Sequence, residues 1–147
     1  LYCPIIFKFF PNSKIIHCIR NPLDNILSIY RTNFLNQSFS SSLKDITDMY
    51  IYQMKLMHEY KSKFGSRIYS YDHDKVVRNP EESIKDLINW LDWKWSDEYL
   101  SPQKSKRIVF TASSAQVREK INSRSSGYWI NYEDLLEPFS VLFPSCN

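Results

Sequence analysis

The sequence predicts an α/β fold in which a short parallel sheet is flanked by helices. Two short runs, at residues 15–19 and 67–72, are rich in β-branched or aromatic residues and have the length of strands. The first run is apolar around a single histidine, which is typical of a strand covered on both faces of a parallel sheet. Apolar residues recur at helical spacing between and after these runs, so we expect helices to connect and cover the strands.

The chain begins with an apolar segment at residues 1–10, which we interpret as the end of a helix. The segment lacks the basic region and the small-residue cleavage site of a signal peptide. It also lacks an initiator methionine, so we expect the beginning of this helix to lie upstream.

The first predicted strand leads directly into a helix that carries its own start signals. Asn21 can cap this helix, Pro22 suits its first position and Asp24 favours its first turn. Arg20 lies at the junction between strand and helix, and Ser28 lies off the apolar stripe of the helix. That stripe comprises Leu23, Ile26, Leu27, Tyr30 and Phe34.

This junction has the ingredients of a phosphate-binding site. Ligands of open α/β sheets gather at the carboxyl ends of the strands, where a helix N-terminus offers free N–H groups and a positive dipole end. Arg20 adds a planar, permanently charged fork for phosphate oxygens, and Ser28 adds a hydroxyl. The structural alternative is that Arg20 pairs with Asp24 and that Ser28 is only a surface hydroxyl.

The middle of the chain predicts one long amphipathic helix from Leu43 to Phe64. Gly65 follows this helix directly and comes after two lysines, so we expect it to end the helix. Its apolar positions at helical spacing include Ile46, Tyr50, Met54 and Met57.

Two further helices follow the second predicted strand. Asn79 and Pro80 open the first of them, because proline suits the first helical position and acidic residues follow it. The last helix is expected to start near Asn131, and Pro138 within it predicts a kink or an early end.

Composition narrows the classes of function. The 147 residues suffice for one domain with a sizeable core, and 43% apolar and 24% charged residues are typical of globular proteins. A net charge of +3 is compatible with an anionic small ligand and does not require nucleic acid, and no run is long enough to span a membrane. Cys3, Cys18 and Cys146 have no metal-like spacing, so we expect no metal site and expect Cys18 to pack as a small buried residue.

Glycine is scarce, with only Gly65 and Gly127 in the chain. A cradle for a diphosphate or phosphosulfate needs glycine so that backbone N–H groups can approach the ligand closely. The sequence contains neither a G-x-G-x-x-G motif nor a P-loop.

The run from Arg20 to Ser28 reads Arg-x-Pro-x-Asp-x-x-x-Ser and resembles the 3′-phosphate-binding motif of the sulfotransferases. Three more blocks, at residues 74–95, 111–118 and 122–129, resemble later segments of that family in the same order. The likeness is greatest to the bacterial, tetratricopeptide-linked branch, which is related to protein-tyrosine sulfotransferases. It implies a partial three-layer, P-loop-like sulfotransferase fold, in which residues 1–147 form the C-terminal portion of a single domain. The 5′-phosphosulfate loop would then lie upstream.

The resemblance also implies roles for particular residues. Arg20 and Ser28 would hold the 3′-phosphate of 3′-phosphoadenosine 5′-phosphosulfate (PAPS) or of its product PAP. Ser113 matches a serine that contacts the donor near the transferred sulfuryl group, where a hydroxyl can stabilise developing charge. Arg124 belongs to a loop that folds over the donor.

Two positions depart from the family pattern. His73 stands where tyrosine-sulfating relatives have a tyrosine beside the adenine, and Tyr71 would share its face of the second strand. An imidazole could also stack on a purine. Tyr128 replaces a basic residue that several relatives carry directly before the tryptophan.

The resemblance implies an enzyme that transfers a sulfuryl group from PAPS to an acceptor hydroxyl, with no metal. It further implies tetratricopeptide repeats upstream in the full-length chain. From the cysteine use, which is compatible with a reducing compartment, and from the charge and composition, we expect a cytoplasmic protein with no nucleic-acid or membrane partner. The family's general base and phosphosulfate loop lie upstream of this region, so we expect no turnover by the chain alone. Two alternatives stay open: a non-catalytic module that binds 3′-phosphorylated nucleotides, and a purely structural α/β fragment.

Overall fold

The computed structural model describes residues 2–32, 34, 37–105 and 119–143. Two strands pair in parallel, with Ile15 opposite Ile68 and Ile19 opposite Asp72. The principal elements are α1 (Cys3–Phe9), β1 (Ile15–Ile19), α2 (Pro22–Thr32), α3 (Leu43–Phe64), β2 (Ile68–Asp72), α4 (His73–Arg78), α5 (Pro80–Trp90) and α6 (Glu133–Ser140). Short 3₁₀ helices occupy Ser38–Ser41, Gly65–Arg67, Asp97–Leu100, Pro102–Lys104 and Tyr128–Tyr132.

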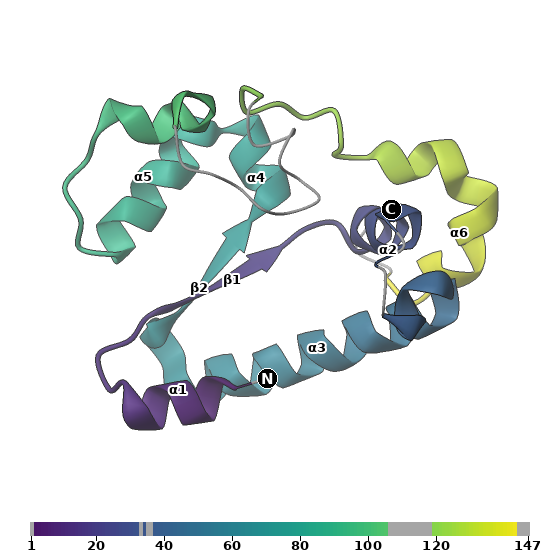
Figure 1. Ribbon diagram of the computed structural model, residues 1–147, viewed down its shortest axis with the longest axis horizontal. Helices are drawn as coiled ribbons and strands as arrows, with labels where there is room; N and C mark the ends of the chain where they lie inside the picture. Colours follow the sequence, from purple (N-terminus) through teal and green to yellow (C-terminus); the bar gives the residue numbers. More distant parts are fainter. Residues whose placement is uncertain (1, 33, 35–36, 106–118, 144–147) are drawn as a thin grey trace.

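The elements form a helix–sheet–helix arrangement. In Figure 1, α3 runs along one side of the two strands, whereas α4 and α5 lie on the other side, and all three helices contact β2. This arrangement confirms the predicted α/β class with a short parallel sheet flanked by helices. The described part of α1 agrees with the prediction of a helix at the start of the chain.

Helix α2 starts as predicted but ends earlier. The Asn21 side chain caps it, because Asn21 Oδ1 accepts hydrogen bonds from the backbone N–H groups of Leu23 (3.0 Å) and Asp24 (3.2 Å). Its apolar face packs with α3 and α6 in a core that comprises Leu23, Ile26, Leu27, Ile46 and Leu136. The prediction that Tyr30 and Phe34 belong to this face is wrong: α2 ends at Thr32, and both rings are exposed.

Helix α3 has the predicted bounds, from Leu43 to Phe64. The hydroxyl of Ser42 caps its N-terminus by accepting from the backbone N–H of Asp45 at 3.2 Å. Gly65 ends the helix with φ +52°, a left-handed value that a side chain would disfavour. The predicted glycine stop is therefore confirmed.

The two faces of β1 differ, so the prediction of a strand covered on both faces is wrong. His17 is buried on one face, where its Nε2 lies 3.0 Å from Gln53 Nε2 of α3. Burial lowers the pKa of His17, and the charge of Lys61 lowers it further. Ile16 and Cys18 point the other way and are exposed, because that face opens onto a large cavity. The expectation of a buried Cys18 is therefore also wrong.

Helices α4 and α5 follow β2 without a long connection. The carboxylate of Asp72 caps α4 by accepting from the backbone N–H groups of Asp74 (2.9 Å) and Lys75 (3.1 Å). Pro80 occupies the start of α5, as predicted. The two helices share a small core of Val76, Ile84 and Ile88.

The C-terminal segment returns to α2. Helix α6 begins at Glu133 after the 3₁₀ helix Tyr128–Tyr132, slightly later than predicted, and Leu136 buries its side chain completely in the α2–α3 core. Pro138, for which a kink or an early end was predicted, lies inside α6, and the helix continues for two more residues to Ser140. None of the described helices combines the length and apolar character needed to cross a bilayer.

Candidate anion and nucleotide site

Arg20 follows directly after the carboxyl end of β1 and precedes α2, as the strand–helix junction requires. A hydrogen bond from Arg20 Nη2 to the backbone carbonyl of Ser125 ties the guanidinium to a segment 105 residues away. The same nitrogen lies 3.9 Å from Asp24 Oδ2. The Arg20 Nε is buried and has no hydrogen-bond partner in the described part of the chain. A buried charged donor without a partner is costly, so this position favours an anion.

The N-terminus of α2 does not supply the free N–H groups that the sequence predicted. Asn21 Oδ1 takes the N–H groups of Leu23 and Asp24, and Pro22 has none. The Asn21 N–H donates to Asp74 Oδ2 at 2.6 Å. An anion at this junction must therefore be held mainly by side chains, with the helix dipole as a weaker contribution.

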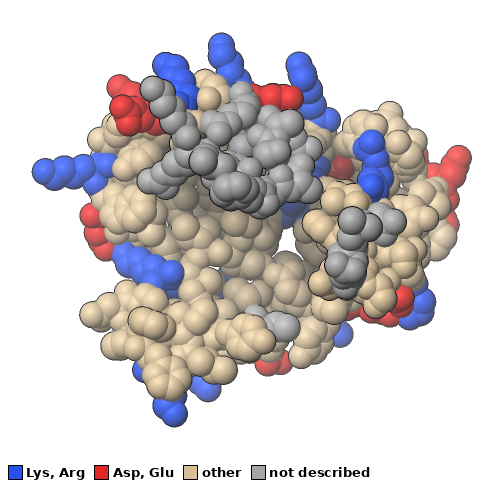
Figure 2. Space-filling model, viewed as in Figure 1, with Lys and Arg blue, Asp and Glu red and all other residues tan. Residues whose placement is uncertain are grey.

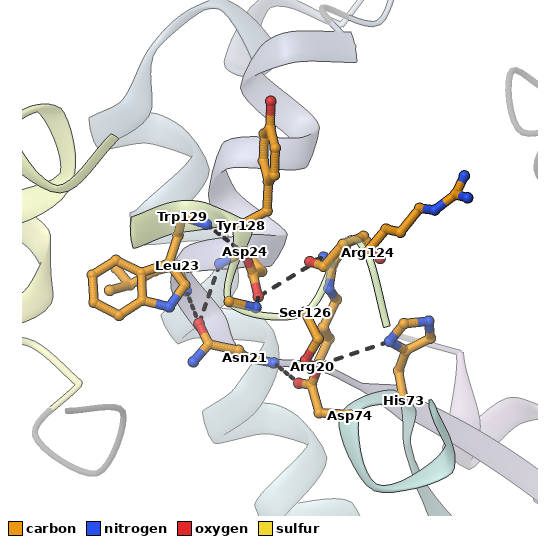
Figure 3. Close-up of polar contacts among 12 residues, drawn as sticks. Arg20, Asn21, Leu23, Asp24, His73, Asp74, Arg124, Ser126, Tyr128 and Trp129 are labelled. Carbon is orange, nitrogen blue, oxygen red and sulfur yellow. Dashed lines mark hydrogen bonds and ion pairs between the residues drawn. The ribbon is translucent and has the colours of Figure 1, made fainter. Parts of the chain in front are cut away.

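The Asp24 carboxylate would repel an anion at this junction if it faced the cavity without hydrogen-bond donors of its own. Its side chain is turned into the protein and accepts hydrogen bonds from the backbone N–H groups of Gly127 (2.6 Å) and Trp129 (2.8 Å). The residue is only 2% exposed. Figure 3 shows these contacts linking α2 to the segment from Ser125 to Trp129. Hydrogen bonds to a carboxylate are stronger than neutral ones, so Asp24 holds this segment over the junction. The Arg20–Asp24 ion pair, which belongs to the structural alternative, is also present.

Asp74 at the start of α4 holds the same segment from the other side. Its Oδ1 accepts a hydrogen bond from the Ser126 hydroxyl at 2.5 Å, and its Oδ2 accepts from the Asn21 N–H. Burial acts to raise the pKa of Asp74, but these two hydrogen bonds, helped by His73 and Arg20, lower the pKa below its ordinary value of 3.8. The ionised carboxylate is therefore the form that the fold stabilises.

The Asp74 contribution to stability should depend on pH. Because the folded-state pKa is lowered, the contribution is fully present above pH 3.8 and is lost as the pH falls through the lower, folded-state pKa. We expect Asp74→Asn to reduce the free energy of unfolding at pH 7 by about 1–3 kcal/mol. The difference from the wild type should shrink on acidification, as measured by urea unfolding at pH 7, 5 and 3. The exposed Asp48→Asn is the matched control, and an Asp74→Asn difference that stays constant with pH would contradict the assignment.

Two cavities meet at Arg20 and Ser28. The smaller cavity has a volume of about 300 Å³, enough for several water molecules, and therefore for a phosphate group. The larger one has a volume of about 890 Å³ and lies against the exposed face of β1. Arg20, Ser28 and Ser125 line both. A ligand with an anionic group and a larger body can therefore occupy both cavities at once.

The structure brings four of the five sequence-predicted site residues to the larger cavity: Arg20, Ser28, His73 and Arg124. The expectation that His73 continues the face of β2 is wrong, because the strand ends at Asp72 and His73 is the first residue of α4. Tyr71 and His73 line the larger cavity all the same. Arg124 lies at the rim with its side chain 84% exposed and 3.7 Å from Glu119. Ser113 lies outside the described residues.

Sequence reasoning missed Arg31 and gave no role to the ring of Tyr128. Both line the smaller cavity with Arg20 and Ser28. Arg31 could have been found from its spacing, since it comes three residues after Ser28 and so lies on the same side of a helix. The position of Tyr128 beside this cavity could not have been found from the sequence, because it depends on the hydrogen bonds that hold the segment after residue 124 against α2.

The charge distribution fits a local site for a small anion. On the face shown in Figure 2, lysine and arginine side chains are dispersed around the rim and do not form one continuous stripe. Among the described residues there is no cluster of three or more histidine, cysteine, aspartate or glutamate side chains that could hold a metal ion.

The fold and the site thus define a class: an α/β protein with a candidate anion site at a strand–helix junction beside a large cavity. The profile described as "Sulfotransferase family" matches residues 1–97 of the chain. The chain therefore belongs to the sulfotransferase family.

Two relatives show how much of this chain, and how much of each longer protein, the sequence similarity covers. An uncharacterized protein of Aquifex aeolicus (strain VF5) is 36% identical over 141 residues, which are 93% of this chain and 18% of that protein. A protein-tyrosine sulfotransferase of Drosophila melanogaster is 23% identical over 134 residues, which are 85% of this chain and 27% of that protein. The chain thus spans less than a third of the length of either relative.

Proposed function

We propose that this chain is the part of a PAPS-dependent sulfotransferase that holds the 3′-phosphate end of the donor. The observation that carries the proposal is the buried, unpartnered Nε of Arg20 at a cavity shared with Ser28. Among the described residues the Ser28 hydroxyl makes no hydrogen bond, so it is free to donate to the same anion. Family membership supports the proposal, as does the name of the Drosophila relative.

The larger cavity would receive the nucleoside. Its walls combine the rings of Tyr71 and His73 with the apolar side chains of Val76 and Ile84, which suits a purine better than a charged group. Tyr71 or His73 could stack on the base. Arg124 would contribute a cation at the rim, and Ser113 would lie near the transferred group.

The donor supplies the sulfuryl group when it is bound. In the transfer, the acceptor oxygen forms a bond to sulfur, the bond between sulfur and the bridging oxygen to phosphorus breaks, and the acceptor hydroxyl proton leaves to a general base. The described residues would bind the 3′-phosphate and contact the nucleoside. The general base and the 5′-phosphosulfate loop would come from upstream, so we expect the 147-residue chain to bind PAP without catalysing transfer.

The proposal also covers the domain organisation, the cellular compartment and the partners of the full-length protein. Residues 1–147 would form the C-terminal portion of one domain, in a cytoplasmic protein with tetratricopeptide repeats upstream. Its partners would be the nucleotide donor and a hydroxyl acceptor, with no nucleic acid or membrane.

Titration calorimetry of the chain with adenosine 3′,5′-bisphosphate tests the proposal. The Ser28→Ala variant tests whether the Ser28 hydroxyl contacts the phosphate. Loss of one hydrogen bond to a charged phosphate should weaken binding by about tenfold to a hundredfold. Ser62→Ala, at an exposed position on α3, should bind like the wild type. No binding by the wild type would refute the proposal.

An activity assay separates the enzyme from the binding module. A longer natural chain that includes the upstream region should transfer radiolabelled sulfate from PAPS to a hydroxyl acceptor. Binding of the bisphosphate without transfer by any longer chain would favour the non-catalytic module instead.

A further inference from the structure

His17 is a buried titratable group that the proposed function does not use. It lies in the middle of β1, on the face that α3 covers, and is only 7% exposed. No carboxylate in the described part of the chain lies within ion-pair distance of its ring. Its Nδ1 is buried and has no hydrogen-bond partner there either. The surroundings of the ring therefore disfavour a positive charge.

The neighbours of His17 favour the neutral imidazole. The side-chain nitrogen of Gln53 on α3 lies 3.0 Å from His17 Nε2. An amide nitrogen only donates, so the ring nitrogen that faces it must accept, which requires that this nitrogen carry no proton. The charged group that acts on His17 from α3 is Lys61, and this like charge adds to burial in lowering the pKa of His17 below its ordinary value of 6.5. On β2, Ser70 lies opposite His17 and accepts a hydrogen bond from Lys61, so it adds no negative charge.

The same face of α3 also supports the carboxyl end of β1. Tyr50 lies three residues before Gln53, so the two side chains share one side of the helix. The Tyr50 hydroxyl donates a hydrogen bond to the backbone carbonyl of Arg20 at 3.4 Å. Helix α3 thus contacts the chain at His17 and again at Arg20, which leads into α2. Looser packing at the first contact would weaken the support of the second.

We propose that His17 makes the packing of α3 against β1 sensitive to pH. The neutral ring accepts from Gln53 and is buried between the strand and the helix. Protonation would turn an N–H donor toward the Gln53 amide nitrogen and would add a second positive charge near Lys61. Helix α3 would then pack less firmly on β1, and the backbone of Arg20 would lose part of its support. The expected effect on nucleotide binding rests on the proposed function, whereas the effect on folding does not.

Acidification should destabilise the chain within a defined range of pH. Because the pKa of His17 is lowered in the folded state, the unfolded chain binds the proton more readily than the folded one. The stability that the neutral ring contributes is fully present above pH 6.5 and is lost as the pH falls through the folded-state pKa. The equilibrium constant for unfolding should rise by up to about tenfold for each pH unit in this range. Asp74 acts at lower pH, because its pKa is already below 3.8 in the folded state.

Urea unfolding between about pH 7.5 and about pH 5 tests the inference. We expect the urea midpoint of the wild type to fall across this range. His17→Gln retains an acceptor for Gln53 but cannot take up the proton, so its midpoint should change much less with pH. His58→Gln is the matched control, because it removes an exposed histidine from α3 and should keep the pH dependence of the wild type. Circular dichroism at pH 7.5 shows whether each variant is folded.

Two substitutions around His17 should change the pH dependence without removing the histidine. Gln53→Glu places a carboxylate beside the ring, which stabilises the imidazolium, so acidification should lower its midpoint less than that of the wild type. Lys61→Met removes the like charge and should also reduce the dependence on pH. A Gln53→Glu variant whose midpoint falls as steeply as that of the wild type would contradict the inference, even if His17→Gln does not fold.

Nucleotide titrations examine the link from α3 to Arg20. Because phosphate groups also titrate near pH 6, the variants are compared with one another at each pH. The affinity of the wild type for adenosine 3′,5′-bisphosphate should fall on acidification by several-fold more than that of His17→Gln. Equal falls in affinity, together with different urea midpoints, would refute the link to Arg20.

The outcomes distinguish this inference from the proposed function. Urea midpoints of His17→Gln and the wild type that depend equally on pH overturn the role of His17 and leave the proposed function standing. A wild-type chain that binds no bisphosphate at any pH refutes the proposed function, and the urea midpoints then decide the role of His17 in folding by themselves.

Discussion

Replacing Arg20 by alanine should nearly abolish binding of adenosine 3′,5′-bisphosphate. The variant removes a guanidinium whose buried Nε has no partner among the described residues and whose Nη2 is held by the Ser125 carbonyl. Truncating one member of a desolvated charge pair costs about 2–5 kcal/mol, or roughly 30-fold to several thousand-fold in affinity. Titration calorimetry would measure the loss.

The specificity of the Arg20 effect depends on two comparisons. Arg20→Lys keeps the charge but loses the planar fork, so its affinity should fall between those of the wild type and Arg20→Ala. Arg78→Ala removes an exposed arginine and should have little effect. If Arg20→Ala remains folded by circular dichroism and binds the nucleotide like Arg78→Ala, the anion is not held at this junction.

The second large effect is expected from Asp24→Ala, and it is an effect on stability. The substitution leaves the Gly127 and Trp129 N–H groups without their acceptor and removes the carboxylate nearest to Arg20. Unsatisfied, partly buried donors make the expected loss about 2–4 kcal/mol in the free energy of unfolding. Urea unfolding would measure it.

Nucleotide affinity should fall together with stability in Asp24→Ala. The segment that Asp24 holds contains Ser125, which accepts from Arg20, and Tyr128, which contacts Arg31. Release of this segment would therefore disturb both arginines.

An exposed aspartate on α3 provides the control for Asp24. Asp48 pairs with Lys44 at 2.6 Å, but its side chain is 60% exposed, so Asp48→Ala should cost only about 0.3–0.5 kcal/mol. Equal losses for Asp24→Ala and Asp48→Ala would show that the hydrogen bonds to the segment after residue 124 contribute little to stability.

Local signals in the sequence predicted the elements that carry the site. The Asn21 cap, the bounds of α3 and the Gly65 stop follow from interactions within a few residues of each other, and the structure has all three. The junction of Arg20 with α2 was predictable for the same reason. The family resemblance added the pairing of Arg20 with Ser28, and the structure places both at one cavity.

Contacts between distant segments decided the rest. Cys18 was expected to be buried because its neighbours are apolar, but its side of β1 opens onto the larger cavity. The helix N-terminus was expected to bind the anion through free N–H groups, but Asn21 and Asp74 already use the donors there. Exposure and hydrogen-bond occupancy both depend on what the rest of the chain places nearby.

The amino-acid sequence alone determined α3, the starts of α2 and α5, the two strands and the position of Arg20 between β1 and α2, because caps, glycine stops and apolar spacing act over a few residues. Only the tertiary structure showed that Asp24 turns inward to hold a segment about 100 residues later. The same contact brings the Tyr128 ring to 5.1 Å from the Cζ of Arg31, and both residues line the smaller cavity. The physical reason is that a carboxylate near an anion site is unfavourable unless backbone donors from elsewhere in the fold occupy it.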